Sequence, residues 1–143
     1  MIIKHFSVLA ALFLATLTMT AQQKPERPFS GYLYNKEHNV YMRINLYDED
    51  VVISWQELFG QLPGYLAKEG TTFCWIITSA DVDGNAATLR MINDYGSEDL
   101  TAKLTQDNDS VYTLQQVNGS TIKVPNKGKW AKLPKTIQFI RKK

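Results

Sequence analysis

The residue types that usually perform catalysis are sparse in this sequence. Histidine occurs only at positions 5 and 38, and Cys74 is the single cysteine. Zinc sites draw mainly on His and Cys ligands, and a Ser–His or Cys–His nucleophile needs an adjacent histidine. His5 lies in the first, mostly apolar segment, so His38 would have to be the histidine of any such site, and it lies in a polar turn between Glu37 and Asn39. No nucleophile-elbow, phosphate-binding or dinucleotide-binding motif occurs. We therefore expect no enzyme activity, no catalytic residues, no metal site and no cofactor.

Aromatic residues, which make up 11% of the chain, are the feature that favours binding. In a small β-protein such rings either form the core or line a cavity that accepts a small apolar molecule or stacks on a sugar. Both interpretations remain open from the sequence. If a cavity exists, the predicted ligand-binding residues are Tyr41, Tyr47, Trp55, Phe59, Tyr65 and Trp75.

The elements that must position these rings are short β-strands. Val40, Met42, Ile44 and Leu46 alternate with more polar residues, as in a half-buried strand, and residues 100–104 repeat the pattern. Residues 73–77 are apolar at every position, which predicts a strand covered on both faces. Further strands are predicted over residues 30–35, 51–54, 86–93, 111–117, 121–124 and 136–141.

Short polar turns separate these strands. Asn118-Gly119, between two apolar runs, predicts a tight hairpin. Connections this short make consecutive strands antiparallel neighbours. The sequence therefore predicts an all-β protein, a small antiparallel up-and-down barrel of about eight strands, because closure leaves no exposed edge. A two-sheet β-sandwich is the alternative.

One segment departs from the two-residue period. Trp55, Leu58, Phe59 and Leu62 recur at helical spacing, and Ser54 and Glu57 form a potential capping box before Pro63-Gly64. These signals predict a short helical insertion over residues 55–62, with Tyr65 and Leu66 in a loop. Such a helix would plug the barrel or cover a ligand entrance.

The N-terminus has the pattern of a secretory signal peptide. Residues 1–5 include Lys4, residues 6–17 are mostly apolar, and Ala21 provides a small residue for cleavage. We expect a signal peptide at 1–21, an N-terminal tether at 22–29 containing two prolines, and a single barrel domain at 30–143. The protein is thus expected to be exported, periplasmic or secreted, and soluble rather than membrane-spanning.

Positive charge is concentrated at the C-terminal end. From Lys123 onward the chain has seven lysines and one arginine but no acidic residue. Lysines that alternate with apolar residues indicate a solvated strand face, and export argues against a nucleic-acid partner. We expect no nucleic acid, and the sequence does not identify a protein partner.

The signal, the antiparallel meander, the insertion and the closing segment Trp130-Ala-Lys-Leu-Pro-Lys-Thr-Ile-Gln-Phe-Ile-Arg141 together resemble small exported lipocalin-like (calycin-like) proteins. The lipocalin Gly-x-Trp motif is absent, since Tyr32 and Leu33 follow Gly31. The resemblance implies a non-enzymatic protein that accepts a small apolar or amphipathic ligand in or at the end of its barrel. The alternative is a structural or protein-interaction module with a solid core and no ligand.

Overall fold

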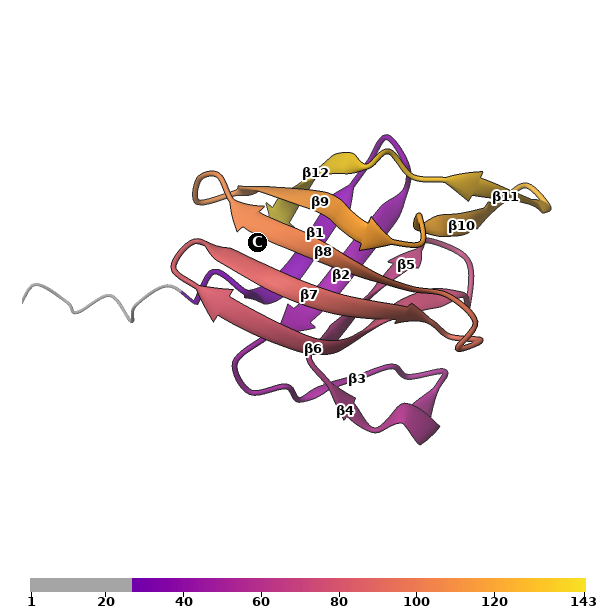
Figure 1. Ribbon diagram of the computed structural model, residues 1–143, viewed down its shortest axis with the longest axis horizontal. Coiled ribbons are helices and arrows are strands. Elements are labelled where there is room, and N and C mark those ends of the chain that lie inside the picture. Colours follow the sequence, from indigo (N-terminus) through magenta and orange to yellow (C-terminus); the bar gives the residue numbers. More distant parts are fainter. Residues whose placement is uncertain (1–26) are drawn as a thin grey trace, which may run out of the picture.

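The computed structural model describes residues 27–143, most of which form a closed antiparallel β-barrel (Figure 1). The order around the barrel is β1, β2, β5, β6, β7, β8, β9 and β12, with β12 pairing back onto β1. Neighbouring strands therefore follow one another along the chain, apart from two small additional sheets, β3–β4 and β10–β11. The predicted up-and-down barrel is confirmed, and its closure decides against a two-sheet sandwich.

The bounds of the elements show how short the connections are. The barrel strands are β1 (Ser30–Asn35), β2 (Val40–Asn45), β5 (Gly64–Lys68), β6 (Cys74–Asp83), β7 (Ala86–Asn93), β8 (Asp99–Gln106), β9 (Val111–Gly119) and β12 (Thr136–Lys142). The additional strands are β3 (Val51–Val52), β4 (Gln61–Leu62), β10 (Lys123–Asn126) and β11 (Lys129–Lys132), and the one helical element of residues 27–143 is a 3₁₀ turn (Glu57–Phe59).

Alternation along the strands produces the barrel interior. Val40, Met42 and Ile44 of β2 are buried while the residues between them are partly or fully exposed, as predicted. β8 follows the same rule with Leu100, Ala102 and Leu104. Large side chains fill the interior and are fully buried: Phe29, Leu33, Met42, Leu66, Trp75, Ile77, Leu89, Met91, Leu104, Tyr112 and Phe139.

The segment predicted as a helix is instead a flap, residues 51–62, made of β3, β4 and the 3₁₀ turn between them. Leu58, which the helical pattern places on the buried stripe, is 101% exposed, and Phe59 is 40% exposed. Ser54 does not cap the turn, because Gln56 holds the N-cap position without a side-chain hydrogen bond. The predicted helix over residues 55–62 is thus reduced to the 3₁₀ turn Glu57–Phe59, because apolar residues at helical spacing also occur when a chain folds back on itself as a hairpin.

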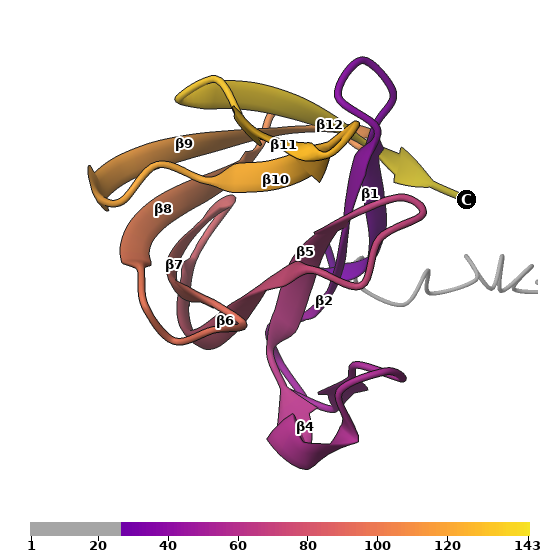
Figure 2. The ribbon, with the colours of Figure 1, turned by 90° about the vertical axis from the view of Figure 1, so that its right-hand side faces the viewer.

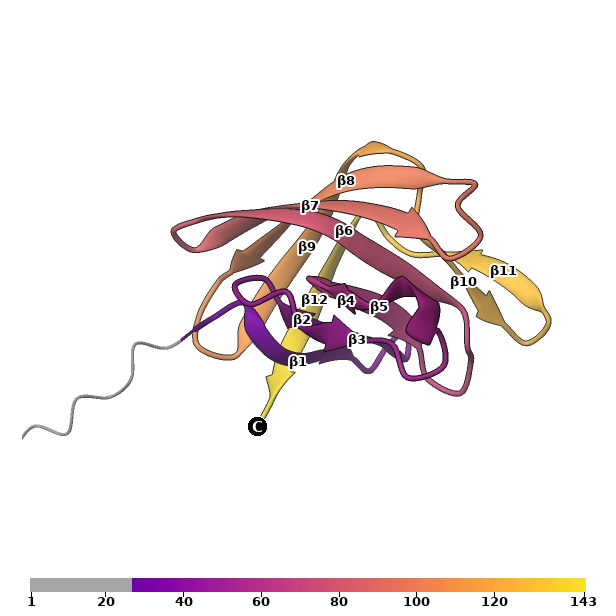
Figure 3. The same ribbon diagram turned by 90° about the horizontal axis from the view of Figure 1, so that it is seen from below.

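The flap covers the outer face of the barrel rather than its end (Figures 2 and 3). Ile53 is fully buried and packs with Tyr65, Ala67, Cys74 and Ile76 in a second apolar cluster. This cover explains why β5 and the start of β6 are buried on both faces. The prediction of a doubly covered strand at 73–77 is thus confirmed, whereas the predicted loop at Tyr65 and Leu66 is the barrel strand β5.

The predicted hairpin at Asn118-Gly119 is not present. β9 continues through Gly119, which pairs with Leu100 of β8, and β10 pairs with β11 rather than with β9. A Cβ atom on Gly119 would lie 2.6 Å from the carbonyl oxygen of Asp99, so close strand approach requires the glycine here. The two-residue hairpin turn falls instead at Lys127 and Gly128, which both have positive φ.

Arg141 on the last strand ties the barrel to the segment before the first strand. Its guanidinium donates to the carbonyl oxygens of Arg27 (3.1 Å), Pro28 (2.8 Å) and Ser30 (3.0 Å), and to the hydroxyl of Tyr112 (3.2 Å). The Tyr112 hydroxyl in turn donates to the Pro28 carbonyl. Residues 1–21 and 22–26 lie outside the described residues, but the end of the expected tether is therefore fixed, and Phe29 is fully buried.

Replacing Arg141 with Met should lower the free energy of unfolding by about 2–4 kcal/mol, because four acceptors lose a charged donor while the aliphatic bulk is kept. Lys142→Met, which removes the exposed neighbouring charge, is the matched control and should cost less than about 0.5 kcal/mol. Urea unfolding measures both. Equal losses would show that Arg141 does not hold the barrel closed.

Ile53→Ala should cost about 2–4 kcal/mol, because the side chain is fully buried under the flap. Leu58→Ala, in the same flap, should cost less than about 0.5 kcal/mol because Leu58 contacts solvent. Thermal unfolding of the two variants compares them directly. A large loss at Leu58 would restore the helical interpretation of the segment.

Candidate ligand-binding site

The six aromatic residues predicted to bind a ligand lie in different parts of the structure. Trp75 is fully buried in the barrel interior. Tyr47 packs under the Arg27 guanidinium, 4.7 Å from ring centroid to Cζ, and Phe59 lies in the exposed turn of the flap. Only Tyr41, Trp55 and Tyr65 come together, on the outer face of the barrel.

These three rings form a row that Tyr32 extends. Ring centroids are 5.6 Å apart for Trp55 and Tyr65, 6.0 Å for Tyr65 and Tyr41, and 5.3 Å for Tyr41 and Tyr32. Trp55 Nε1 donates to the Thr72 carbonyl (2.6 Å), which fixes the flap on the barrel. Burial raises the pKa of Tyr32 to about 12, with a further contribution from its hydrogen bond to Glu69 (2.9 Å). Trp55 packs on the buried Tyr65, so this end of the row attaches the flap to the barrel, whereas Tyr41 and Tyr32 are partly buried.

Asp94 and Cys74 lie side by side next to this covered face. The Asp94 backbone N–H donates to the Cys74 carbonyl (3.1 Å), and Asp94 Oδ1 is buried without a hydrogen-bond partner. Burial raises the pKa of Asp94, although backbone N–H groups oppose the shift. Burial also raises the pKa of the Cys74 thiol to about 12, with a smaller contribution from Asp94. Burial therefore favours the protonated thiol of Cys74 over the thiolate, which is the nucleophilic form.

Three other aromatic residues surround a hollow at one end of the barrel. Phe73, Tyr95 and Trp130 line it, together with Asn93, Ser97, Glu98 and Lys123, and its volume is about 280 Å³. The Phe73 ring lies 4.8 Å from Trp130 and 5.6 Å from Tyr95, centroid to centroid. Trp130 is 54% exposed and Tyr95 is 71% exposed, so both rings are available to a ligand, whereas Phe73 is buried.

A polar loop positions Tyr95. Asn93, at the end of β7, is the one buried polar residue found among residues 27–143. Its side-chain oxygen accepts hydrogen bonds from the backbone N–H groups of Ser97 (2.9 Å) and Glu98 (3.2 Å), and its amide donates to the Ser97 hydroxyl (3.0 Å). Gly96 has a positive φ of 72°, which allows the tight turn. The loop is therefore fixed by hydrogen bonds while its aromatic ring faces solvent.

The β10–β11 hairpin positions Trp130 and extends from the same end of the barrel as this loop (Figure 1). Val124 is buried in the main core, and the interior Trp75 donates from Nε1 to the Lys123 carbonyl (2.9 Å). Lys123 also forms an ion pair with Glu98 (3.3 Å), which joins the hairpin to the β7–β8 loop. The hollow thus lies between two elements that are each attached to the barrel.

Sequence reasoning did not select Tyr95 or Trp130. A usable signal was nevertheless present, because each is a large aromatic residue next to turn residues. Tyr95 precedes Gly96, and Trp130 lies two positions after Gly128. Aromatic side chains in turns have little core to enter, so they are more informative about binding than those on strands.

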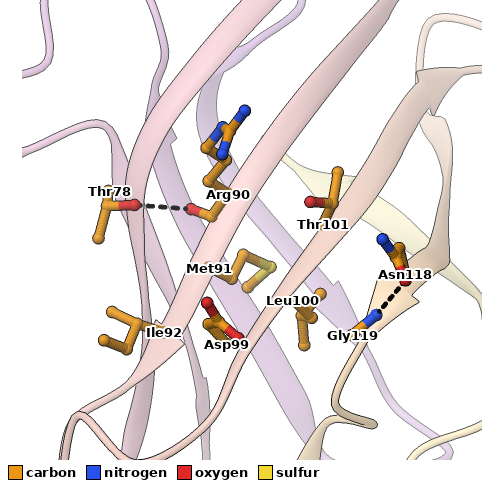
Figure 4. A pocket seen from close by; sticks show the side chains of 9 residues that line it. All are labelled: Thr78, Arg90, Met91, Ile92, Asp99, Leu100, Thr101, Asn118 and Gly119. Atoms are coloured by element: carbon orange, nitrogen blue, oxygen red, sulfur yellow. Dashed lines mark hydrogen bonds between the residues drawn. The ribbon is translucent and has the colours of Figure 1, made fainter.

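A second hollow, of about 330 Å³, lies on the outer face of β6 to β9 (Figure 4). Thr78, Arg90, Thr101 and Asn118 line it from four neighbouring strands. Irregular pairing at Thr78 on β6 and between Thr101 and Ala102 on β8 interrupts the ladders here. This hollow lacks an aromatic ring, so it offers fewer ways to orient a ligand than the barrel-end hollow.

Within residues 27–143, no three His, Cys, Asp or Glu side chains are grouped so that they could hold a metal ion. The same part of the chain has no helix that is both long and apolar enough to cross a membrane. The chain matches no protein-family model, no curated protein and no solved structure in the three comparisons made. The architecture and the site geometry therefore carry the functional argument.

Asp94→Asn should stabilise the protein at pH 7. Because folding raises the pKa of Asp94 above its ordinary value of 3.8, the carboxylate form disfavours the folded state at neutral pH. This cost disappears as the pH falls through the raised pKa and the group is protonated. The advantage of the Asn variant should therefore shrink between pH 7 and about pH 4 in urea unfolding. Asp83→Asn, which removes a charge from an exposed strand end, should show no such trend. If the difference in unfolding free energy between Asp94→Asn and the wild type did not change with pH, the raised pKa of Asp94 would be contradicted.

Proposed function

We propose that this protein is an exported, non-enzymatic binding protein of lipocalin-like type that holds a small amphipathic ligand, a saccharide ring, at the end of its barrel. The observation that supports this function is the exposure of Trp130 and Tyr95 around one hollow. Contact between large apolar rings and water is unfavourable. A ligand with an apolar face would cover the rings and thereby gain binding free energy. Export rests on the sequence pattern of residues 1–21.

The chemistry of the hollow favours a ligand with both apolar and polar groups. The C–H face of a sugar ring packs on an aromatic ring, while its hydroxyl groups hydrogen-bond with neighbouring polar side chains. Ser97, Asn93, Glu98 and Lys123 provide such groups beside the rings. A purely apolar ligand would leave the Glu98–Lys123 pair partly desolvated without compensation. The saccharide therefore suits this site better than a lipid does.

Because side chains fill the barrel interior, a ligand site is favoured at the end of the barrel rather than at its centre. The interior carries fully buried Trp, Tyr, Phe, Leu, Ile and Met side chains. Opening space among them would create cavities that cost several kcal/mol each. The hollow at the end already exists and requires no such rearrangement.

Isothermal titration of the wild-type protein against a panel of short oligosaccharides tests the proposal. We expect Trp130→Ala to weaken binding by about tenfold or more, which corresponds to at least roughly 1.4 kcal/mol of stacking energy. Tyr34→Ala removes a partly exposed ring on β1, away from the hollow, and should leave the affinity unchanged. The proposal fails if no saccharide binds, or if the two variants bind alike.

The filled interior also favours a second candidate function, a protein-interaction module with a solid core. Exposed Trp130 and Tyr95 would then contact a protein rather than a sugar. Native mass spectrometry separates the two functions for the purified protein: a stable dimer supports the interaction module, and a retained saccharide supports the binding protein.

A further inference from the structure

The β10–β11 hairpin presents aromatic and cationic side chains on one face. Pro125 pairs with Trp130, and Lys123 pairs with Lys132. Residues directly opposite in an antiparallel pair project to the same side, and alternate pairs share a face. Trp130, Lys123 and Lys132 are therefore on the same face of the hairpin.

The Lys123–Lys132 pairing is electrostatically unfavourable. Like charges placed directly opposite in a sheet are destabilising. Glu98 pairs with Lys123 at 3.3 Å and offsets part of the repulsion. Lys132 is exposed, and Lys127 adds a further positive charge in the turn of the hairpin, whereas Lys129 pairs with Asn126 and lies on the opposite face. The hairpin thus has a surplus of positive charge beside the exposed Trp130.

We infer that the ligand is an acidic oligosaccharide, whose carboxylate groups bind Lys132 and its neighbours while one ring stacks on Trp130. This inference rests on the proposed function, because it specifies the ligand class of the same hollow. Because Lys123 is already paired with Glu98, a ligand carboxylate would bind Lys132 and offset its repulsion from Lys123. Glu98 and Lys123 neutralise each other within the hollow, so the charge selection comes from the hairpin lysines outside it.

The decisive experiment compares one saccharide in two charge states. Short oligogalacturonates and their methyl-esterified forms have the same rings and differ in whether the carboxyl groups carry charge. Titration calorimetry with the full mature chain should show the acid form binding at least about tenfold more tightly at low salt. The difference should shrink as added NaCl screens the charges.

Three variants distinguish this inference from the proposed function. Lys132→Gln should weaken binding of the acid form several-fold and leave the methyl ester unaffected, while the melting temperature stays equal to or above that of the wild type. Lys103→Gln removes an exposed charge from β8 and should change neither affinity. Trp130→Ala should weaken both saccharide forms.

The possible results separate the two conclusions. Equal affinity for the acid and its ester, both lost in Trp130→Ala, overturns the acidic ligand and leaves the saccharide-binding function standing. Binding of the acid that Trp130→Ala does not alter overturns both, because charge alone then explains it. Single-stranded DNA that binds as tightly as the acid, with the same dependence on Trp130, also overturns the inference, since the site would then select polyanions in general.

Discussion

Closure of the barrel depends on the contacts that Arg141 makes with the chain before β1. The β1–β12 ladder joins three residue pairs, whereas β1 and β2 share six. This short ladder, the seam at which the barrel closes, is its weakest strand pairing, and a closed barrel needs every strand to be paired. Arg141 reinforces it with four donated hydrogen bonds, and a Cβ atom on Gly31 would lie 2.8 Å from its Nη1. Once the seam is closed, Phe29 and Tyr112 are sealed in the interior.

The filled interior leaves the exposed aromatic rings at the rim of the barrel. In a barrel of eight strands, side chains of ordinary size occupy the lumen, and here Trp75, Tyr112 and Phe139 do so. The exposed rings are therefore on the loop after β7 and on the β10–β11 hairpin, where they do not contribute to the core. Trp75 links the two regions, because the same indole that packs the core hydrogen-bonds Lys123 of the hairpin. The hollow is thus attached directly to the buried core of the barrel.

Strand alternation made most of the fold predictable, and the exceptions have physical causes. β1, β2 and β7 fall within the predicted runs because one face of each strand is exposed to solvent and the other is buried, which produces the alternating sequence pattern. β5 was missed because the flap covers its outer face, which removes the alternation, and because Pro63 and Gly64 precede it. The barrel-end hollow could not be predicted, since it joins Tyr95 and Trp130 across 35 residues of chain through the packing of the hairpin, which no local pattern encodes.

The contacts of Arg141 also affect the order of folding. Its hydrogen bond to Ser30 spans 111 residues, and that to Arg27 spans 114. Contacts between such distant residues form late and slow the search for the native state, because a long loop must be closed first. The central hairpins β6–β7 and β7–β8 can form locally, but the cylinder remains an open, curved sheet until the last residues are free to join. A chain that crosses a membrane unfolded, N-terminus first, would therefore complete its barrel only after its C-terminus has emerged.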